Sequence, residues 1–373
     1  MKTAGPFFVG GDIYRRPGFG ANHPLAIPRV GLVLEICEAM SWLDENYLDS
    51  PMADDKALLR FHDRDYLEAV KRVAMAGRAE ENDRVRYQLG TMENPVFEGL
   101  EQRARTTCGG SILAAEKALA GCVAFNPAGG THHGMPDHAH GFCYFNDPVM
   151  AIMTLLDGGA GSIFYLDLDA HHGDGVEAAF LDEPRVVTLS IHERARWPGT
   201  GTAHGGRGAG AYNYPVPKGF NDCELAALMS GAVLPMIEEL KPDVAVITCG
   251  ADALAGDPLS GMMLSNVALW DAVTAVTERV PGAVVLGGGG YNPWTVARCW
   301  SGLWGRLSGR TPPWPVPEKI KVRFDEIECD LVDEEDIDQA WRERLDDAPN
   351  KAPVREEVAA LIGDTGSDWR EVV

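Results

Sequence analysis

The chain has 373 residues, of which 45% are hydrophobic and 24% are charged, and this composition excludes disordered, collagen-like and coiled-coil proteins. Its 33 basic and 55 acidic residues give a formal net charge of −22, so nucleic acids and anionic membrane surfaces are poor candidate partners. No run of about 18 apolar residues, the length that would cross a bilayer, occurs in the sequence.

The eight cysteines form no Cys-x-x-Cys pair, and several lie within apolar runs. This usage is typical of buried free thiols in a reducing compartment. The first 16 residues lack the long apolar core of a secretory signal. We therefore expect a cytoplasmic protein without disulfide bonds.

Residues 29–75 are predicted to be largely helical, with a turn at 61–63. From about residue 122 to residue 290 the sequence repeats one unit: a short β-branched run, a glycine-rich or polar loop, and a segment of helical composition. Nearly continuous apolar strands that alternate with helices indicate a parallel sheet covered on both faces and joined by right-handed crossovers. The predicted strands are 122–126, 162–168, 186–191, 243–249 and 283–286, and the predicted helices include 111–120, 224–240 and 266–279.

The composition changes after Leu307. A proline-rich stretch at 311–317 breaks regular structure, and an acid-rich stretch follows at 325–347. We therefore predict a main domain over residues 1–310 and an acidic C-terminal extension over residues 311–373, which packs on that domain or trails from it.

Polar motifs follow the predicted strands, and ligands of open parallel sheets bind at the carboxyl ends of the strands. Any one motif has a simple structural explanation, such as a buried histidine pair, a flexible glycine turn or a helix-capping aspartate. Their combination at one edge of a sheet is difficult to explain by folding and indicates a functional site. The motifs are NPAGGTHHG from Asn126, DLDAHHGDG from Asp167, HE at His192, GAD and GDP between Gly250 and Pro258, and GGGGYN from Gly287.

The spacing of the acidic and histidine residues indicates a catalytic metal. Asp167, Asp169 and His171 are spaced two residues apart at the end of a strand. In a strand, side chains two residues apart point in the same direction. Asp169 and His171 can therefore share one ion, with Asp257 from another loop as the third ligand. Two carboxylates and one imidazole leave a coordination position open, as in catalytic rather than structural sites.

The remaining motif residues supply the groups needed to hydrolyse an amide. His132 and His133 are expected beside the metal, and Asp167 and Asp174 are left to orient the two imidazoles. A metal lowers the pKa of bound water, and an imidazole takes its proton. Tyr291, on a glycine-rich loop, can hydrogen-bond the developing oxyanion.

Five blocks in order resemble the zinc-dependent histone deacetylase family: GGTHHG, GFCYFND, YLDLDAHHGDGVE, GADALAGDPL, and GGGGYN followed by ARCW. Within that family the chain is most similar to class I-like bacterial members of the acetoin-utilisation deacetylase type. The similarity runs from about Tyr14 to Leu307, includes His23, Pro24 and Arg29, and does not extend into the C-terminal segment.

The resemblance implies the arginase/deacetylase fold, an α/β fold whose parallel eight-stranded sheet carries helices on both faces and long active-site loops. It makes residues 1–310 a deacetylase catalytic domain with one Zn²⁺ per chain and a structural K⁺ or Na⁺. It implies hydrolysis of N6-acetyl-lysine, or of a short acyl-lysine, in a protein or peptide substrate, with release of acetate. The oligomeric state is left open.

The resemblance also implies roles for individual residues. The general base and acid pair is matched by His132 and His133, their relay carboxylates by Asp167 and Asp174, and the transition-state tyrosine by Tyr291. The zinc ligands are matched by Asp169, His171 and Asp257, and the monovalent cation site by Asp167 and Ser190. The substrate pocket and its acetate channel are matched by Gly141, Phe142, Trp197, Leu264, Glu93 and Arg29.

The chain departs from the family pattern at three positions near the substrate. Trp197 stands where the second pocket aromatic is usually Phe, and Thr131 stands where an aromatic residue or leucine commonly precedes the histidine pair. The rim aspartate that grips the substrate backbone is shifted and replaced by Glu93. These departures bear on acyl preference and backbone gripping, and they leave the catalytic residues intact.

Three other functions fit parts of the sequence. An arginase-like ureohydrolase with two Mn²⁺ needs Asp-x-His-x-Asp, but Gly173 stands at the last position of that motif. An acetylpolyamine amidohydrolase would use the same zinc and a carboxylate at the pocket mouth, where Leu264 offers none, although Glu93 and the net charge keep this alternative open. A non-catalytic acyl-lysine-binding protein is expected to have lost Tyr291, a paired histidine or a ligand, and none is missing.

Overall fold

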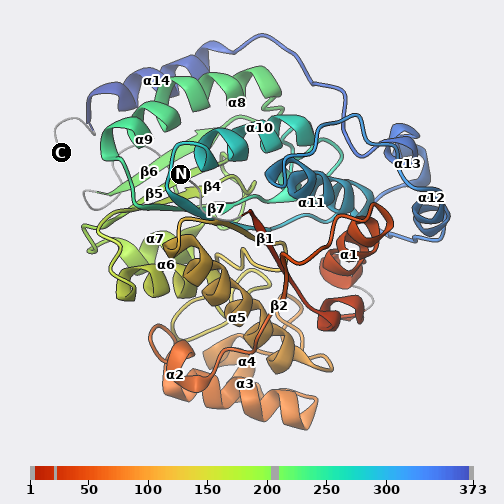
Figure 1. Ribbon diagram of the computed structural model, residues 1–373. Helices are drawn as coiled ribbons and strands as arrows, with labels where there is room; N and C mark the ends of the chain where they lie inside the picture. Colours follow the sequence, from red (N-terminus) through yellow and green to blue (C-terminus); the bar gives the residue numbers. More distant parts are fainter. Residues whose placement is uncertain (1–4, 21–22, 203–209, 369–373) are drawn as a thin grey trace.

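The computed structural model describes residues 5–20, 23–202 and 210–368 (Figure 1). At its centre lies one eight-stranded sheet in the order β2-β1-β3-β8-β7-β4-β5-β6, and all its strand pairs are parallel. The predicted parallel eight-stranded sheet is therefore confirmed. The strands are β1 (Phe7–Gly10), β2 (Tyr47–Asp49), β3 (Val123–Asn126), β4 (Ile163–Asp167), β5 (Val186–Glu193), β6 (Ala211–Val216), β7 (Val244–Thr248) and β8 (Gly282–Leu286).

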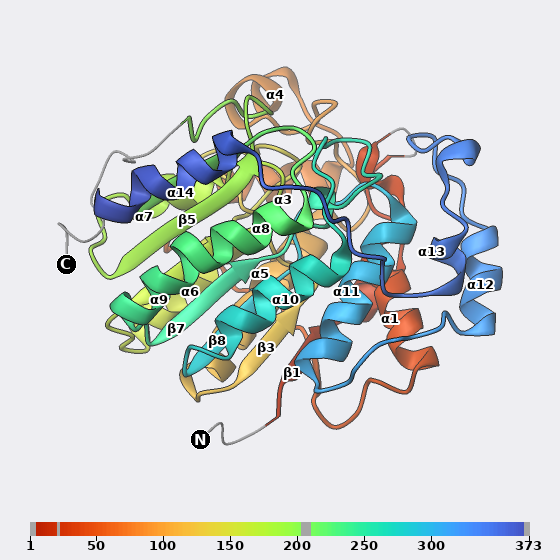
Figure 2. The same ribbon diagram turned by 90° about the horizontal axis from the view of Figure 1, so that it is seen from above.

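Helices cover both faces of the sheet, as predicted (Figure 2). One face is covered by α5 (Leu100–Leu119), α6 (Asp147–Asp157) and α7 (Asp174–Phe180), beside which lie α2 (Asp55–Leu58), α3 (Arg64–Ala76) and α4 (Glu81–Tyr87). The other face is covered by α1 (Val30–Ala39), α8 (Asp222–Leu228), α9 (Leu234–Leu240), α10 (Asn266–Thr277) and α11 (Pro293–Leu307).

Alternate residues of the central strands face two separate apolar cores. In β4, Ile163 and Tyr165 belong to the core beneath α5 and α6, while Phe164 and Leu166 belong to the core beneath α10 and α11. Every residue of this strand is buried. Burial on both faces explains why the central strands are continuous apolar runs in the sequence.

The five strands predicted by position are present, and the three further strands of the eight-stranded sheet were not located in the sequence. β2 has only three residues and lies inside the 29–75 stretch predicted as helical, and β6 carries Pro215 at the edge of the sheet. Edge strands tolerate proline, and in β6 Asn213 and Pro215 interrupt the apolar run although five of its six residues are buried. β1 has four residues and lies beside β2.

The C-terminal segment forms α12 (Glu318–Asp325), α13 (Ala340–Glu343) and α14 (Glu356–Asp368). The indole Nε1 of Trp294, in α11, donates to the Phe324 carbonyl at 3.1 Å. Arg355, just before α14, binds both carboxylate oxygens of Glu224 at 2.6 and 2.7 Å. The segment therefore packs on the helices beside the sheet, whereas a domain boundary at residue 310 remains a prediction.

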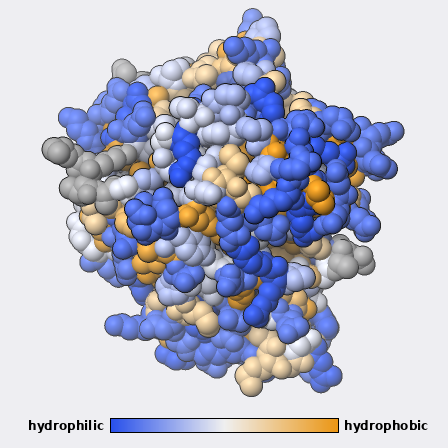
Figure 3. Space-filling model, turned by 45° about the vertical axis from the view of Figure 1, so that its right-hand side comes forward, coloured by the Kyte–Doolittle hydropathy of each residue, from blue (hydrophilic) through white to orange (hydrophobic). Residues whose placement is uncertain are grey.

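The surface view in Figure 3 shows a largely hydrophilic face with apolar residues scattered among polar ones. Within the described residues, no helix combines the length and the apolarity needed to cross a membrane. All eight cysteines are free, as predicted, and six of them are buried.

Candidate active site

A cavity of about 530 Å³ opens at the carboxyl edge of the sheet, where the loops after β3, β4, β5, β7 and β8 meet. Four of its lining residues, His133, His171, Glu193 and Tyr291, come from motifs that the sequence places after strands. The lining residues are Glu93, His133, Gly141, Phe142, His171, Glu193, Arg194, Ala195, Arg196, Trp197, Leu259 and Tyr291.

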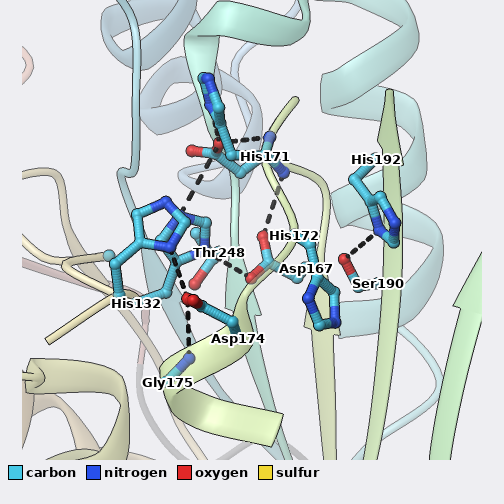
Figure 4. A network of polar contacts seen from close by, with 12 residues as sticks. His132, Asp167, His171, His172, Asp174, Gly175, Ser190, His192 and Thr248 are labelled. Atoms are coloured by element: carbon cyan, nitrogen blue, oxygen red, sulfur yellow. Dashed lines mark hydrogen bonds and ion pairs between the residues drawn. The ribbon is translucent and has the colours of Figure 1, made fainter. Parts of the chain in front are cut away.

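Each histidine of the tandem pair is held by its own carboxylate. His132 Nδ1 lies 2.7 Å from Asp167 Oδ2 (Figure 4), and His133 Nδ1 lies 2.7 Å from Asp174 Oδ1. Both imidazoles are buried, and their ring centroids are 4.0 Å apart. The carboxylates accept the Nδ1 protons, and in a neutral imidazole this leaves the lone pair on Nε2.

The two imidazoles differ in charge. Burial by itself would lower the pKa of His132, but Asp167 and Asp169 outweigh it and raise the pKa to about 9. Burial and the neighbouring charge of His132 lower the pKa of His133 to about 3. At neutral pH the pair therefore consists of one cationic and one neutral imidazole.

Asp169 and His171 lie together, as predicted, and a second carboxylate beside them is that of Asp252. His171 Nδ1 is 3.1 Å from Asp169 Oδ1 and 2.9 Å from Asp252 Oδ2, and the three residues offer ligand atoms that lie within 4.8 Å of one another. Burial lowers the pKa of His171, but the two carboxylates raise it to about 10, so a proton is held between two anions. Tetrahedral zinc with bonds near 2.1 Å separates its ligand atoms by roughly 3.3 Å, and the donor types and spacing here fit such an ion.

Asp257, the predicted third ligand, is not a member of that group. It is buried, its Oδ1 accepts the Leu259 amide proton at 2.9 Å, and its Oδ2 accepts the Tyr291 amide proton at 2.7 Å. Burial and the charge of Asp252 raise its pKa to about 7. Asp257 therefore joins the loop after β7 to the loop that carries Tyr291.

Sequence reasoning assigned no role to Asp252, although the GAD motif follows the strand over 243–249. The signal that identifies it is its position three residues after Cys249, at the end of a fully buried strand. Its Oδ1 also accepts the amide proton of Ala170 at 3.0 Å, so it binds the loop that carries the ligand group.

Close backbone approach explains the glycine-rich loop after β8. Gly289 N donates to Asp169 Oδ2 at 2.6 Å, and a Cβ on Gly288 would lie 2.8 Å from the same oxygen. Gly288 has a φ of 140°, a conformation that strongly favours glycine. The loop thus places backbone against the ligand group and brings Tyr291 to the cavity wall.

Phe142 and Trp197 line the cavity, as the resemblance implied. The side chain of Trp197 packs edge-on against His133 at 4.7 Å, and a Cβ on Gly141 would lie 2.4 Å from its ring. Glu93 also lines the cavity, and one of its carboxylate oxygens accepts the Gly141 amide proton.

Leu264, which the resemblance places at the pocket mouth, does not line the cavity in this structure. Leu264 is only 1% exposed, pairs with Leu254 in a β-bridge, and belongs to the apolar core. Leu259, five residues earlier in the same loop, lines the cavity instead.

Arg29 lies beside a second cavity of about 410 Å³, which also borders Thr131 and Phe142. One guanidinium nitrogen donates to the Gly288 carbonyl, and the group stacks on Trp300 with its carbon 4.9 Å from the ring centroid. Its Nε is buried without a hydrogen-bond partner in the described structure. A buried guanidinium with a free donor suits a small anion.

Asp167 and Ser190, the predicted monovalent-cation residues, lie opposite each other in the paired strands β4 and β5. Asp167 Oδ2 also accepts the Tyr165 hydroxyl at 2.6 Å, and Ser190 Oγ lies 2.8 Å from His192 Nδ1 (Figure 4). The structure brings the two residues together, and their role with a cation remains a prediction.

Comparison with known proteins gives one consistent result. A model of the histone deacetylase domain matches residues 23–307. The acetoin utilization protein AcuC of Bacillus subtilis is 30% identical over 374 residues, which cover 95% of each chain. Histone deacetylase 8 of Xenopus tropicalis is 33% identical over 299 residues, covering 78% of this chain and 80% of that protein.

Among solved structures, an HDAC homolog from Aquifex aeolicus superposes with a TM-score of 0.92 at 36% identity and covers 98% of this chain and 100% of its own. An HDAC homolog complexed with SAHA gives a TM-score of 0.91 at the same identity and coverage. These matches confirm the arginase/deacetylase fold. The family model ends at Leu307, as expected, whereas the matches to AcuC and to the solved structures extend past it into the C-terminal segment.

Proposed function

Because this chain belongs to the histone deacetylase family, a family of hydrolases, we propose that it is a zinc-dependent protein lysine deacetylase. The observation that carries the proposal is the pair of histidine–carboxylate contacts, His132–Asp167 and His133–Asp174, beside a buried group of metal-ligand residues. The substrate is an acetylated lysine in a protein or peptide, and the products are the deacetylated lysine side chain of that protein or peptide and acetate.

Zinc is the proposed cofactor, held by Asp169, His171 and Asp257, with Asp252 beside His171. Two carboxylates and one imidazole leave a position open for substrate. When bound, zinc supplies Lewis-acid polarisation of the amide carbonyl and lowers the pKa of a water molecule. A K⁺ or Na⁺ beside Asp167 and Ser190 is proposed as a structural ion.

His133 is proposed as the general base. It is neutral, Asp174 occupies its Nδ1, and its ring lines the cavity, so its Nε2 can accept a proton from the attacking water. The same nitrogen can then return the proton to the departing lysine amine. His132 stays cationic between Asp167 and Asp169, so it stabilises negative charge that develops beside it.

Tyr291 is proposed to stabilise the oxyanion. Burial and the nearby carboxylates raise the pKa of its hydroxyl well above the usual value, so the group remains a hydrogen-bond donor at neutral pH. Its ring lies at the cavity wall, 6.0 Å from that of Phe142 and 6.4 Å from that of His171. The hydroxyl strengthens its bond as charge moves onto the carbonyl oxygen.

The charge of the cavity mouth favours lysine over a polyamine. Glu93 and Glu193 are balanced there by Arg194 and Arg196. Both oxygens of Glu193 are bound by Arg196, at 2.7 and 3.0 Å, and a Glu93 oxygen is taken by the Gly141 amide. A polyamine carries extra positive charge and would need a free carboxylate there. The neutral acetyl-lysine stem needs only the Phe142 and Trp197 walls.

A substrate screen tests the proposal. Purified protein supplied with zinc is assayed on acetyl-, propionyl- and longer acyl-lysine peptides and on acetylated polyamines. We expect the highest kcat/KM for acetyl-lysine peptides and loss of turnover on chelation. Preference for acetylspermidine would overturn the lysine assignment and support the acetylpolyamine alternative. Absence of turnover on every substrate would instead support a non-catalytic acyl-lysine-binding protein.

Location in the cytoplasm is proposed from the eight free cysteines.

A further inference from the structure

His140 is a titratable residue of the active-site region that the proposed mechanism does not use. It immediately precedes Gly141, and its ring lies 4.7 Å from that of Trp197 and 6.0 Å from that of His133. Its Nδ1 is buried and has no hydrogen-bond partner in the described structure, although Asp174 Oδ2 is 3.5 Å away. An unpartnered imidazole nitrogen that faces a carboxylate is an unusual arrangement for a purely structural histidine.

Three residues converge at this point. Asp174 presents one oxygen to His133 Nδ1 at 2.7 Å and the other to His140 Nδ1 at 3.5 Å, and the ligand atoms of the three residues lie within 4.8 Å of one another. The separation expected between ligands of tetrahedral zinc, roughly 3.3 Å, lies between these two distances. Two imidazoles and one carboxylate form a donor set that zinc and similar divalent cations prefer.

An ion can reach this cluster through the substrate cavity. His133 lines that cavity, and His140 packs on Trp197, whose side chain is 41% exposed at the cavity wall. The side chains of His140 and Asp174 are 26% and 11% exposed, so neither is sealed from solvent. The cluster is distinct from the Asp169–His171 group, because it shares no residue with that group.

We propose that His133, His140 and Asp174 form a second, inhibitory site for Zn²⁺ or another borderline divalent cation. Binding moves the His133 Nδ1 proton to Nε2 and gives the Nδ1 lone pair to the metal. His140 Nδ1 and an Asp174 oxygen complete the set, with water in the open position. Nε2 then carries a proton and accepts no other, so the general base is lost. Metal binding rests on the cluster alone, and the inhibition rests on the proposed role of His133.

Metal stoichiometry tests the site without reference to activity. Full-length chain freed of metal is titrated with Zn²⁺ under equilibrium dialysis, and bound metal is measured. We expect a first equivalent at the Asp169–His171 group and a weaker second one. His140→Asn should weaken the second equivalent by at least about 10-fold, since loss of groups around a metal typically costs 10- to 100-fold in affinity. Equal binding of a second equivalent by wild type and His140→Asn would overturn the proposal.

His138→Asn is the matched control. His138 is a neighbouring histidine that also faces a carboxylate, with its Nδ1 2.6 Å from Asp137, but it does not belong to the cluster. This variant should bind both equivalents as wild type does. A loss as large as that of His140→Asn would show nonspecific surface binding and count against the site.

Inhibition by excess metal tests the consequence. Zinc-loaded enzyme is assayed with rising free Zn²⁺, and each variant is compared with its own uninhibited rate. The half-inhibitory concentration should rise at least about 10-fold in His140→Asn and stay unchanged in His138→Asn. Equal inhibition of all three proteins would overturn the inhibitory role. Should no substrate be turned over, the proposed function fails, and the dialysis result still decides whether the second site exists.

Discussion

Two buried aspartates compete for the role of third zinc ligand. The resemblance selects Asp257, whereas the contact geometry places Asp252 beside His171, at 2.9 Å from its Nδ1. We expect Asp257→Asn to lower zinc affinity more than Asp252→Asn, since a lost ligand costs more than a lost partner of a ligand, which typically costs 10- to 100-fold. Metal content measured after dialysis against graded chelator ranks the two variants. The reverse order would make Asp252 the ligand.

Tyr291→Phe isolates one hydroxyl. The ring stays against Phe142 and His171, so fold and zinc content should be unchanged, while kcat should fall on the order of 10² to 10³ because one oxyanion donor is lost. Steady-state kinetics on an acetyl-lysine peptide measures the loss, and circular dichroism controls for folding. Turnover near that of wild type would mean that the tyrosine serves the loop and not the chemistry.

Leu259 replaces Leu264 as the residue on which selectivity is tested. Leu259→Glu places a carboxylate at the cavity wall, where the distal ammonium of a polyamine could pair with it. A partly desolvated pair contributes about 1 to 3 kcal/mol, so the ratio of kcat/KM values should move toward acetylspermidine by roughly 5- to 150-fold. Leu259→Gln is the neutral control of similar size and should leave the ratio near that of wild type. An equal change in both variants would assign the effect to shape.

At the level of secondary structure, an unbroken apolar run in the sequence marks the central strands that could be predicted. β4 and β7 are buried along their whole length and were recognised, whereas β2 and β6 lie at the two edges of the sheet. Helix α5 begins at Leu100, eleven residues before the predicted start. The pair Gly109–Gly110 inside this helix is typical of a helix end when only the sequence is considered. In the structure the missing side chain allows close packing, because a Cβ on Gly109 would lie 1.9 Å from the Pro51 carbonyl oxygen.

The C-terminal segment supports the loop that carries Asp257. A Cβ on the preceding Gly256 would lie 2.8 Å from the ring of Trp341, in α13, so the two are in close contact. Trp341 is 9% exposed, and truncation of a buried tryptophan typically costs about 3 to 5 kcal/mol. We expect Trp341→Ala to lower the free energy of unfolding by about that amount in urea titrations. Trp341→Phe keeps an aromatic ring there and should cost less; equal costs would show that the contact contributes little.

For the molecule as a whole, sheet topology made the site predictable. Residues as distant in sequence as His133 and Tyr291 lie around one cavity because parallel strands end at one edge, and position after a strand was enough to find them. Side-chain direction within a loop was not predictable. Leu264 and Asp252 lie in the same connection between β7 and α10, and the turns of that loop bury the first and bring the second to His171.

The same buried carboxylates couple stability of the whole molecule to pH and metal. Burial, with repulsion from Asp169, raises the pKa of Asp252 to about 6, and burial with repulsion from Asp252 raises that of Asp257 to about 7. An unfolded aspartate titrates near 3.9. Between about pH 4 and pH 7 Asp252 and Asp257 therefore bind more protons in the metal-free folded chain than in the unfolded chain, so these two groups stabilise the fold at the acid end and that contribution is lost as pH rises.

Zinc competes with those protons, so the stabilisation that zinc gives should grow over the same interval. We expect the difference in free energy of unfolding between zinc-loaded and metal-free protein to increase from pH 5 to pH 7. The increase should be a few kcal/mol, because each unit of pKa shift corresponds to about 1.4 kcal/mol. Urea titrations at both pH values, with free zinc held constant, measure this difference.

Groups whose pKa is lowered by ion pairs, such as Glu224 bound to Arg355, contribute equally to the zinc-loaded and the metal-free protein and cancel in the difference. Asp257→Asn removes one of the two titrating groups and should flatten the increase; a wild-type difference independent of pH would mean that zinc does not displace protons from these aspartates.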